Sequence, residues 1–281
     1  MIQNVAVIGS GTMGKGIALV FAQFGYNVEL IDTSKDVLDV SFNKISKDLD
    51  KQIRRGVVSL EIKESILKRI STNPNINNIL YDTDLVIEAI YEDKAAKLLL
   101  YNKIDGLTKS NCIFASNTSS ISITQLQSDI RPMQFIGMHF MNPVPIMKLV
   151  EVIKGHSTNP ETYNTIIEVV KSINKIPVPV NDYPGFIANR ILIPMINEAI
   201  YTVFEGVASI EDVDSVMKLG ANHPMGPFEL ADFIGLDICL DIMNVLYAGF
   251  GDPKYRPCPL LKKMVAAKKL GKKSGEGFYK Y

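Results

Sequence analysis

The opening of the chain places two short apolar segments on either side of a helical pattern. The segments NVAVIG (4–9) and NVELID (27–32) are rich in β-branched residues and have the length of buried strands. Between them, apolar residues recur at helical spacing from Met13 to Phe24. A strand, a helix and a second strand in this order predict a βαβ unit, so an α/β fold is expected.

The loop between the first strand and the helix is GSGTMG (9–14), a G-x-G-x-x-G pattern. Gly9 permits a tight turn, Gly11 lets a pyrophosphate approach the backbone, and Gly14 allows close packing of helix and strand. The helix N-terminus adds N–H donors and partial positive charge. Asp32 ends the second strand, where a carboxylate can accept from ribose hydroxyls. The combination favours a dinucleotide site over a tight turn without a ligand.

The residues around Asp32 bear on which dinucleotide binds. A carboxylate here repels a 2′-phosphate, and Thr33 and Ser34 follow it instead of an arginine. The pattern therefore predicts NAD over NADP. Lys35 is close enough in sequence to keep NADP as an alternative.

Further segments continue the alternation of strands and helices. A helical stretch carries an apolar stripe from Leu38 to Ile53, is interrupted at Gly56, and resumes with a stripe from Ile62 to Ile70, which predicts an inserted helical hairpin. Strands are expected at 84–90, 111–117, 134–140, 147–153 and 176–180, and helices at 94–104, 123–127 and 161–173. Prolines in the last of these strands predict that it lies at a sheet edge.

The character of the sequence changes at DYPGF (182–186), where Pro and Gly mark a break. We therefore expect an N-terminal domain over 1–183 and an all-α C-terminal domain over 184–281. Helices are expected at 186–204, with a kink at Pro194, and at 210–218, 227–247 and 259–269.

Composition argues against several classes of protein. The 281 residues are 47% hydrophobic and 21% charged with no net charge, so neither a disordered chain nor a basic nucleic-acid-binding protein is expected. The start lacks the pattern of a signal peptide, and no apolar run is long enough to cross a bilayer. Cys112, Cys239 and Cys258 fit neither a disulfide framework nor a metal cluster. A cytoplasmic protein without a metal or a membrane partner is expected.

His139 and Glu151 are the strongest candidates for proton transfer. Alternation places His139 near the C-terminal end of the strand over 134–140, where ligands bind in open α/β sheets. Glu151 lies between apolar neighbours in the strand over 147–153, a costly position for an unpaired acid. A carboxylate beside an imidazole would hold its tautomer and stabilise the imidazolium. Spacing alone leaves open a core histidine and a solvent-facing glutamate on an edge strand.

Longer motifs point to a family. They are VAVIGSGTMGKGIA, the inserted hairpin, VIEAIYED, ASNTSS, GMHFMNPVPIMKLVEVI, DYPGFIANRIL, HPMGPFELADFIGLD and GKKSGEGFYKY. With them the chain resembles the 3-hydroxyacyl-CoA dehydrogenases essentially from end to end, in their short-chain bacterial form that acts on 3-hydroxybutyryl-CoA. The resemblance implies a Rossmann-like N-terminal domain and a helical C-terminal domain through which two copies form a homodimer.

By this resemblance, His139 and Glu151 form the catalytic pair. Ser119, from NTSS, and Asn189, from PGFIANR, are implied at the 3-oxygen of the substrate, where a hydroxyl and an amide can donate hydrogen bonds. From the residues alone, Ser119 could equally cap the next helix, and Asn189 could hold the domain linker.

Contacts to the cofactor and to coenzyme A are also implied. The implied cofactor contacts are Gly9, Gly11, Thr12, Met13, Gly14, Asp32, Glu92, Lys97, Asn117, Ser119, Asn142 and Lys273. Lys51 and Arg54, with Arg55, form a basic helix face that suits the phosphates of coenzyme A. A solvated helix face is the alternative for these basic residues.

The implied reaction is reversible hydride transfer between NAD(H) and C3 of a short 3-hydroxyacyl-CoA. It interconverts 3-hydroxybutyryl-CoA and acetoacetyl-CoA, in butyrate/butanol-type or fatty-acid metabolism. The enzyme alternatives are an NADP-preferring form and a related dehydrogenase of a free hydroxy acid. A nucleotide sensor or a structural protein with this fold is the non-enzymatic alternative, which the intact set of proposed site residues argues against.

Overall fold

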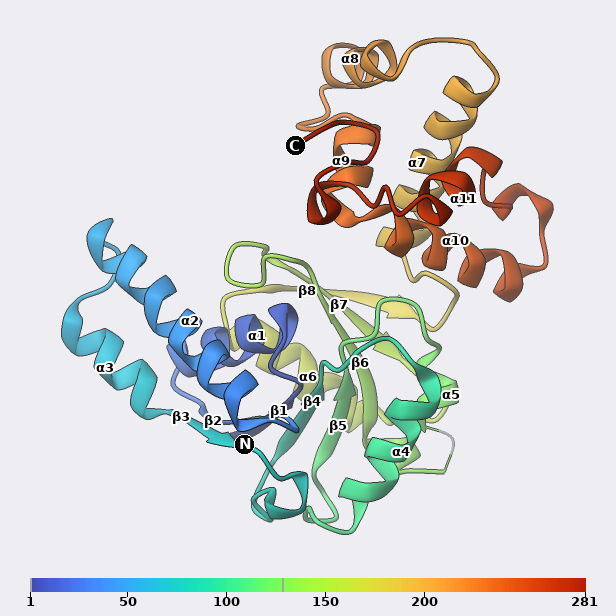
Figure 1. Cartoon of the computed structure of the whole chain (residues 1–281). Helices are drawn as coiled ribbons and strands as arrows, with labels where there is room; N and C mark the ends of the chain where they lie inside the picture. Colours follow the sequence, from blue (N-terminus) through green and yellow to red (C-terminus); the bar gives the residue numbers. More distant parts are fainter. Residues whose placement is uncertain (1, 128) are drawn as a thin grey trace. The chain divides into compact units, whose positions relative to one another are not determined.

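The protein divides into two compact units, Met1–Asp182 and Tyr183–Tyr281. The structure, a computed structural model, describes residues 2–127 and 129–281, and Figure 1 traces the chain through both units. Each unit has a hydrophobic core of its own. The division falls one residue before the boundary expected from the sequence.

The first unit is built on one sheet. Its strands are β1 (Asn4–Ile8), β2 (Asn27–Ile31), β3 (Ile70–Asn73), β4 (Leu85–Glu88), β5 (Ile113–Ser116), β6 (Phe135–Phe140), β7 (Leu149–Lys154) and β8 (Ile176–Asn181). The order across the sheet is β3-β2-β1-β4-β5-β6-β7-β8. Strands β1 to β6 run parallel, β7 is antiparallel to β6, and β8 is parallel to β7. The order of the first six strands is that of a Rossmann fold, which confirms the expected fold class.

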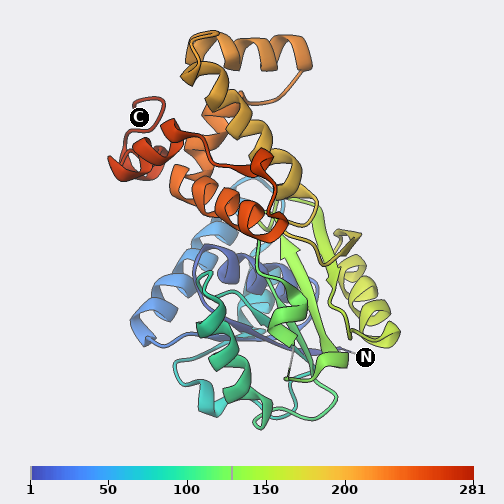
Figure 2. The same cartoon turned by 90° about the vertical axis from the view of Figure 1, so that its right-hand side faces the viewer.

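Helices cover both faces of this sheet. They are α1 (Thr12–Gln23), α2 (Lys35–Arg54), α3 (Leu60–Lys68), α4 (Lys94–Asp105), α5 (Ile123–Gln127) and α6 (Pro160–Ser172), with 3-10 turns at Ile76–Asn78 and Pro132–Gln134. Figure 2 shows α6 on the opposite side of the sheet from α4 and α5. Helices α2 and α3 form the expected hairpin, in which Leu38, Ile45 and Leu49 bury the apolar stripe of α2.

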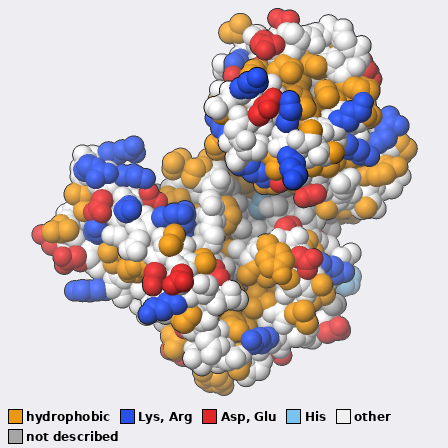
Figure 3. Space-filling view, in the orientation of Figure 1, with side chains coloured by type: hydrophobic (Ala, Val, Ile, Leu, Met, Phe, Trp, Pro, Cys, Tyr) orange, Lys and Arg blue, Asp and Glu red, His pale blue; other side chains and the backbone are white. Residues whose placement is uncertain are grey.

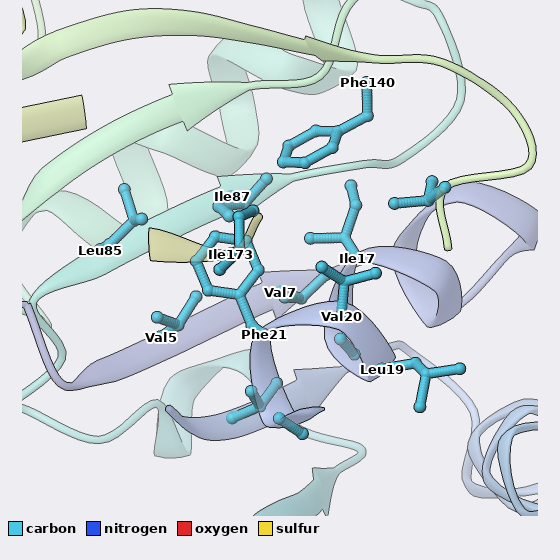
Figure 4. Close-up of a cluster of buried hydrophobic side chains, with 14 of the residues drawn as sticks. Val5, Val7, Ile17, Leu19, Val20, Phe21, Leu85, Ile87, Phe140 and Ile173 are labelled. Atoms are coloured by element: carbon cyan, nitrogen blue, oxygen red, sulfur yellow. The ribbon is translucent and has the colours of Figure 1, made fainter. Parts of the chain in front are cut away.

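The core between α1 and the sheet fixes the start of α1. Ile17 and Phe21 on α1 lie beside Val7 of β1 and Ile87 of β4 (Figure 4). Phe21 also meets Phe140 of β6 edge to face, with 6.5 Å between ring centroids. Because α1 directly follows β1, its N-terminus lies at the carboxyl ends of these parallel strands.

Two details of the first unit test the sequence prediction. β8 is an edge strand, as its prolines predict. Ile70, expected at the end of the second hairpin helix, instead begins β3, because α3 ends at Lys68 and the following residues pair with β2. A four-residue strand with one buried residue, Ile70, has too short a pattern to be separated from a helix end.

The second unit is helical, as expected. Its helices are α7 (Ala188–Phe204), α8 (Ile210–Ala221), α9 (Pro227–Ile234), α10 (Leu236–Phe250) and α11 (Pro259–Ala266), with 3-10 turns at Pro253–Tyr255 and Lys272–Ser274. The single helix expected over 227–247 is wrong, because Gly235 has φ +107° and separates α9 from α10 at an angle of 96°. Pro194 lies inside α7, and the kink there stays a prediction.

The C-terminal tail of the second unit is held by two buried carboxylates. Asp232 accepts from the backbone N–H groups of Phe278 and Tyr279, both at 2.9 Å. Asp214 accepts from the Tyr279 hydroxyl at 2.9 Å and from the Phe228 N–H at 2.8 Å. These contacts dock the tail against α8 and α9.

Among the described residues, no single helix has the length and apolar content needed to cross a membrane. The bent pair of α9 and α10 meets the criterion only when both helices are taken together, and by length and composition alone.

Candidate active site

The predicted residues of the first unit gather at the carboxyl ends of five parallel strands. They are Gly9 to Gly14 after β1, Asp32 after β2, Glu92 after β4, Asn117 and Ser119 after β5, and His139 and Asn142 at the end of β6. Ligands bind at this edge in open α/β sheets, because the strand ends and helix N-termini meet there.

The glycines of the loop differ in what surrounds them. Gly9 has φ +98°, and a Cβ there would lie 2.5 Å from the Ala89 carbonyl oxygen. A Cβ on Gly14 would lie 1.7 Å from the Gly9 carbonyl oxygen. Gly11 is exposed, and a Cβ there would meet nothing within 4 Å. Gly9 and Gly14 are therefore needed by the fold, whereas Gly11 leaves space beside the N-terminus of α1.

Asp32 braces the glycine loop. Its Oδ2 accepts from the Ser10 backbone N–H at 2.8 Å and from the Ser10 hydroxyl at 2.7 Å. Its Oδ1 accepts from the Thr33 N–H at 2.7 Å. Partial burial raises the pKa of the Asp32 carboxyl, but the hydrogen bonds from Ser10 and Thr33 outweigh it and hold the pKa below its ordinary value. The residue is thus a carboxylate at neutral pH, half-buried at the rim of the loop.

His139 and Glu151 lie directly opposite each other on β6 and β7. The distance from His139 Nδ1 to Glu151 Oε2 is 2.7 Å, and the two residues are 6% and 1% exposed. β7 has a neighbouring strand on both sides. The glutamate is therefore a buried partner of the imidazole and not a solvent-facing residue of an edge strand. Such a partner fixes the orientation and the tautomer of the imidazole ring.

Ser119 lies in the segment Thr118–Ser120 that follows β5, and Glu92 holds this segment. Glu92 Oε1 accepts from the Thr118 hydroxyl at 2.5 Å, from the Ser119 N–H at 2.9 Å and from the Ser120 N–H at 3.1 Å. Asn117, just before the segment, accepts from the Phe140 N–H at 3.0 Å through its side-chain oxygen. The end of β5 is therefore tied to the end of β6, next to His139.

Two of the predicted residues belong to the second unit. Asn189 lies in the first turn of α7 and is partly buried. Lys273 lies in the C-terminal tail, where its ammonium is 2.7 Å from Asp237 Oδ2. Asn189 and Lys273 therefore lie in a different unit from the other predicted site residues.

Sequence reasoning missed one acid of the first unit, Glu88. It is the last residue of β4, it is fully buried, and its Oε1 lies 2.5 Å from the ammonium of Lys97. Lys97 itself is only 1% exposed. A carboxylate that ends an apolar strand could have drawn attention, because an acid in such a position needs a partner.

A groove of about 790 Å³ runs along α1 within the first unit. Its walls are α1, α2, α3 and the chain after β6, and its basic lining residues are Lys15, Lys51, Arg55, Lys148 and Lys175. Of the residues predicted for coenzyme A, Lys51 lines the groove, while Arg54 lies exposed on α2 nearby in sequence. Figure 3 shows Lys and Arg side chains gathered over the tip of the α2–α3 hairpin.

Comparisons with known proteins agree along the whole chain. Residues 4–183 match the NAD binding domain of 3-hydroxyacyl-CoA dehydrogenase, and residues 185–281 match the C-terminal domain of the same family. A probable 3-hydroxybutyryl-CoA dehydrogenase of Deinococcus radiodurans is 53% identical over 98% of this chain and 99% of its own. A 3-hydroxybutyryl-CoA dehydrogenase of Clostridioides difficile is 51% identical over 99% of each.

The solved structure of an (S)-3-hydroxybutyryl-CoA dehydrogenase from Ralstonia eutropha superposes on this chain with a TM-score of 0.96. It is 46% identical, and the match covers 100% of this chain and 99% of that one. The chain therefore belongs to the 3-hydroxyacyl-CoA dehydrogenase family.

Proposed function

We propose that this protein is an NAD(H)-dependent dehydrogenase that interconverts 3-hydroxybutyryl-CoA and acetoacetyl-CoA. The observation that carries the proposal is the buried pair of His139 and Glu151, with Nδ1 and Oε2 2.7 Å apart. His139 lies at the carboxyl ends of the parallel strands, where the glycine loop also lies. Oxidation of an alcohol by hydride loss needs a group that takes the hydroxyl proton, and an oriented histidine is suited to this. The names of the full-length relatives support the choice of substrate.

The residues of the glycine loop fit a dinucleotide. The space beside Gly11 and the N–H groups at the start of α1 would hold the pyrophosphate, and Asp32 would face the adenosine ribose. When bound in its reduced form, the nicotinamide supplies the hydride that reaches C3 of the ketone. The Asp32 carboxylate would repel a 2′-phosphate, which supports NAD over NADP.

His139 handles the proton in both directions. In reduction, the imidazolium gives a proton from Nε2 to the 3-oxygen, while Nδ1 stays against Glu151. In oxidation, the neutral imidazole takes the same proton back. Glu151 orients the ring and balances its charge in the protonated state. We assign Ser119 and Asn189 the role of hydrogen-bond donors to the 3-oxygen, where they would stabilise the charge that develops there.

We assign the groove along α1 to the coenzyme A portion of the substrate. Its mixed lining suits such a ligand, because apolar residues such as Leu19 and Ile62 lie among four lysines and Arg55. Lys51 would meet a phosphate within the groove, and Arg54 would add positive charge at its rim. A dehydrogenase of a free hydroxy acid has no need for a groove of this kind.

Absorbance of the reduced nicotinamide tests the proposal. We expect fast oxidation of NADH with acetoacetyl-CoA, slower oxidation of NADPH, and little reaction with free acetoacetate. Longer 3-ketoacyl-CoA substrates in the same assay define the chain-length range. Equal turnover of the free acid would favour the hydroxy acid alternative, and faster turnover with NADPH would favour the NADP-preferring alternative. NADH binding without turnover of any of these ketones would favour the nucleotide sensor.

We further propose that the protein is a homodimer that associates through its second unit. This unit exposes several large apolar side chains, namely Ile191, Phe204, Val207, Val216 and Leu219. Leu219 is 87% exposed and Val207 is 72% exposed. Large apolar side chains exposed to this degree are typical of an interface between copies. Sedimentation velocity should give a species of about twice the chain mass of 31.1 kDa, and a monomer at micromolar concentration would contradict the proposal.

A further inference from the structure

A buried ion pair lies beneath the end of β4, and its acid, Glu88, has no role in the proposed chemistry. Glu88 is 0% exposed and Lys97 is 1% exposed, and their charged atoms are 2.5 Å apart. Burying two charges carries a large desolvation cost, and a well-packed apolar pair of the same size is often as stable. Stability alone therefore does not explain why Glu88 and Lys97 are buried.

Glu88 accepts hydrogen bonds from four donors on different parts of the first unit. Its Oε1 accepts from Lys97 and from the Ile90 N–H at 2.8 Å. Its Oε2 accepts from the Ser116 hydroxyl at 2.6 Å and from the Tyr101 hydroxyl at 3.2 Å. The carboxylate thus joins β4, α4 and the end of β5 at one point.

Two routes lead from Glu88 to the Thr118–Ser120 segment. In the first, the Lys97 ammonium also lies 3.3 Å from Glu92 Oε2, and Glu92 Oε1 holds the segment through the hydrogen bonds described above. In the second, the Ser116 hydroxyl, which donates to Glu88, accepts from the Thr118 N–H at 3.2 Å. Both routes converge on the backbone that carries Ser119.

Glu92 remains charged, so the first route is intact over the physiological pH range. Burial raises the pKa of the Glu92 carboxyl, but the nearby Lys97 ammonium and the donors from Thr118 and Ser119 outweigh it and lower the pKa below its ordinary value. Lys97 is thus a cation between two carboxylates, one on β4 and one beside the Ser119 segment.

We infer that Glu88 is a positioning residue that fixes the Ser119 segment at the active edge of the sheet, through Lys97 with Glu92 and through Ser116. The inference rests on the proposed function, because Ser119 matters for catalysis only if it donates to the 3-oxygen. Glu88 touches none of the reacting atoms in this scheme. Its effect is to hold the donor where an oxyanion would form, since a displacement of about 1 Å can cost about 100-fold in rate.

The chain offers a matched control at the other end of the same strand. Asp84, just before β4, accepts from the N–H groups of Gln3 at 2.7 Å and Asn4 at 2.8 Å and pairs with Lys109. This carboxylate also ties a lysine to backbone amides, but it lies at the amino end of the parallel strands. Loss of Asp84 should affect stability without moving Ser119.

The first test measures amide hydrogen exchange in Glu88→Gln and in the neutral pair Glu88→Gln/Lys97→Met. We expect the Ser119 and Ser120 amides to exchange at least about tenfold faster than in the wild type, with the Gln3 and Asn4 amides unchanged. Asp84→Asn should instead speed the exchange of the Gln3 and Asn4 amides and leave the Ser119 and Ser120 amides unchanged. The double variant guards against misfolding, because it removes both charges of the Glu88–Lys97 pair, and the Glu92 carboxylate that loses Lys97 has a side chain 38% exposed to solvent. Unchanged protection of Ser119 and Ser120 in folded variants would overturn the inference.

The second test asks whether Glu88 acts through Ser119. We expect Glu88→Gln to lower kcat with acetoacetyl-CoA by about 10- to 100-fold, a larger change than its effect on the KM for NADH. In a Ser119→Ala background the same substitution should have less than about a threefold further effect, since coupled sites are not additive. Full multiplication of the two effects would refute the route through Ser119. If the wild type reduces no ketone at all, the proposed function fails, and the exchange test still decides whether Glu88 holds the segment.

Discussion

Glu151 illustrates what a single residue reveals in the sequence and what it does not. An acid among apolar neighbours on an expected strand already indicated a need for a partner. The alternation also placed His139 on the face opposite Met138, and the buried core of α1 and α6 indeed contains Met138. The register that puts His139 against Glu151 arises because β7 turns back antiparallel to β6. Spacing could not show that reversal, so the pairing needed the structure.

Replacement of Glu151 by Gln should abolish most of the turnover. The amide cannot balance an imidazolium, so we expect kcat to fall by about 100-fold or more while NADH binding persists. Glu168→Gln is a matched control, because Glu168 lies exposed on α6 in the same unit. Steady-state rates with acetoacetyl-CoA and fluorescence titration with NADH check both parts. A variant with the turnover of the wild type would rule out the proposed role of Glu151.

The burial of Glu88 and Lys97 is a second feature of single residues that the sequence did not predict. The resemblance drew attention to Glu92 and Lys97, and both lie near the segment that carries Ser119. The sequence did not show that Lys97 is buried between two acids, because Glu88 and Glu92 are four residues apart across a strand end. Burial of a charged network depends on packing of α4 against the sheet, which no local pattern contains.

Among the helices and strands, most were predictable from the sequence, and the misses were one short strand and one break within a helix. The βαβ opening, the hairpin and the helices α4, α6 and α7 follow from apolar spacing over many residues. β3 was missed because only Ile70 in it is buried. The break between α9 and α10 was missed because apolar residues continue through Gly235, whose positive φ becomes evident only in three dimensions.

The glycine loop predicts opposite outcomes for two similar substitutions. Gly14→Ala should destabilise the protein by about 2 kcal/mol or more, since the new Cβ would overlap the Gly9 carbonyl oxygen. Gly11→Ala should leave the melting temperature of the free protein nearly unchanged, because the Cβ meets open space. It should instead weaken NADH binding by filling the space proposed for the pyrophosphate. Thermal denaturation with and without NADH separates the two effects, and unaltered NADH affinity in Gly11→Ala would contradict the assignment of the loop.

The Asp84 carboxylate, at the junction of β1 and β4, predicts that the stability of the protein depends on pH. Partial burial raises the pKa of the Asp84 carboxyl, but the N–H groups of Asn4 and Gln3 and the Lys109 ammonium outweigh it and hold the pKa below the ordinary 3.8. A carboxyl whose pKa is depressed on folding adds stability that is fully present above pH 3.8 and is lost as pH falls through the lower folded value. The melting temperature of Asp84→Asn should therefore lie below that of the wild type at pH 7 and approach it in acid. A gap that widens in acid would contradict this sign.

At the scale of the whole molecule, two units with separate cores carry the predicted site residues. The break near residue 182 was evident in the sequence from its Pro and Gly and from the change to helical patterns. The anchoring of the tail by Asp214 and Asp232 was not, because both acids lie in helices that read as amphipathic. Lys273 belongs to that tail and contacts Asp237 there. Its role as a cofactor contact stays a prediction.

Ligand linkage gives a prediction for the folded protein as a whole. NADH at 100 times its Kd should raise the free energy of unfolding by about 2.7 kcal/mol, because it binds only the folded state. NADPH at the same concentration should stabilise less, since the Asp32 carboxylate repels the 2′-phosphate. Asp32→Asn should reduce the difference between the stabilisation by NADH and the stabilisation by NADPH. Thermal shift measurements with both nucleotides check this, and equal shifts in the wild type would contradict the assigned NAD preference.

The rate of NADH oxidation by acetoacetyl-CoA, measured side by side for the wild type and His139→Ala, tests the role of His139 as the proton carrier. We expect steady turnover in the wild type and a loss of about 1,000-fold or more in the variant, with NADH binding retained, because the variant lacks the proton carrier and keeps the residues of the nucleotide site. Turnover by His139→Ala at the rate of the wild type would rule out this role.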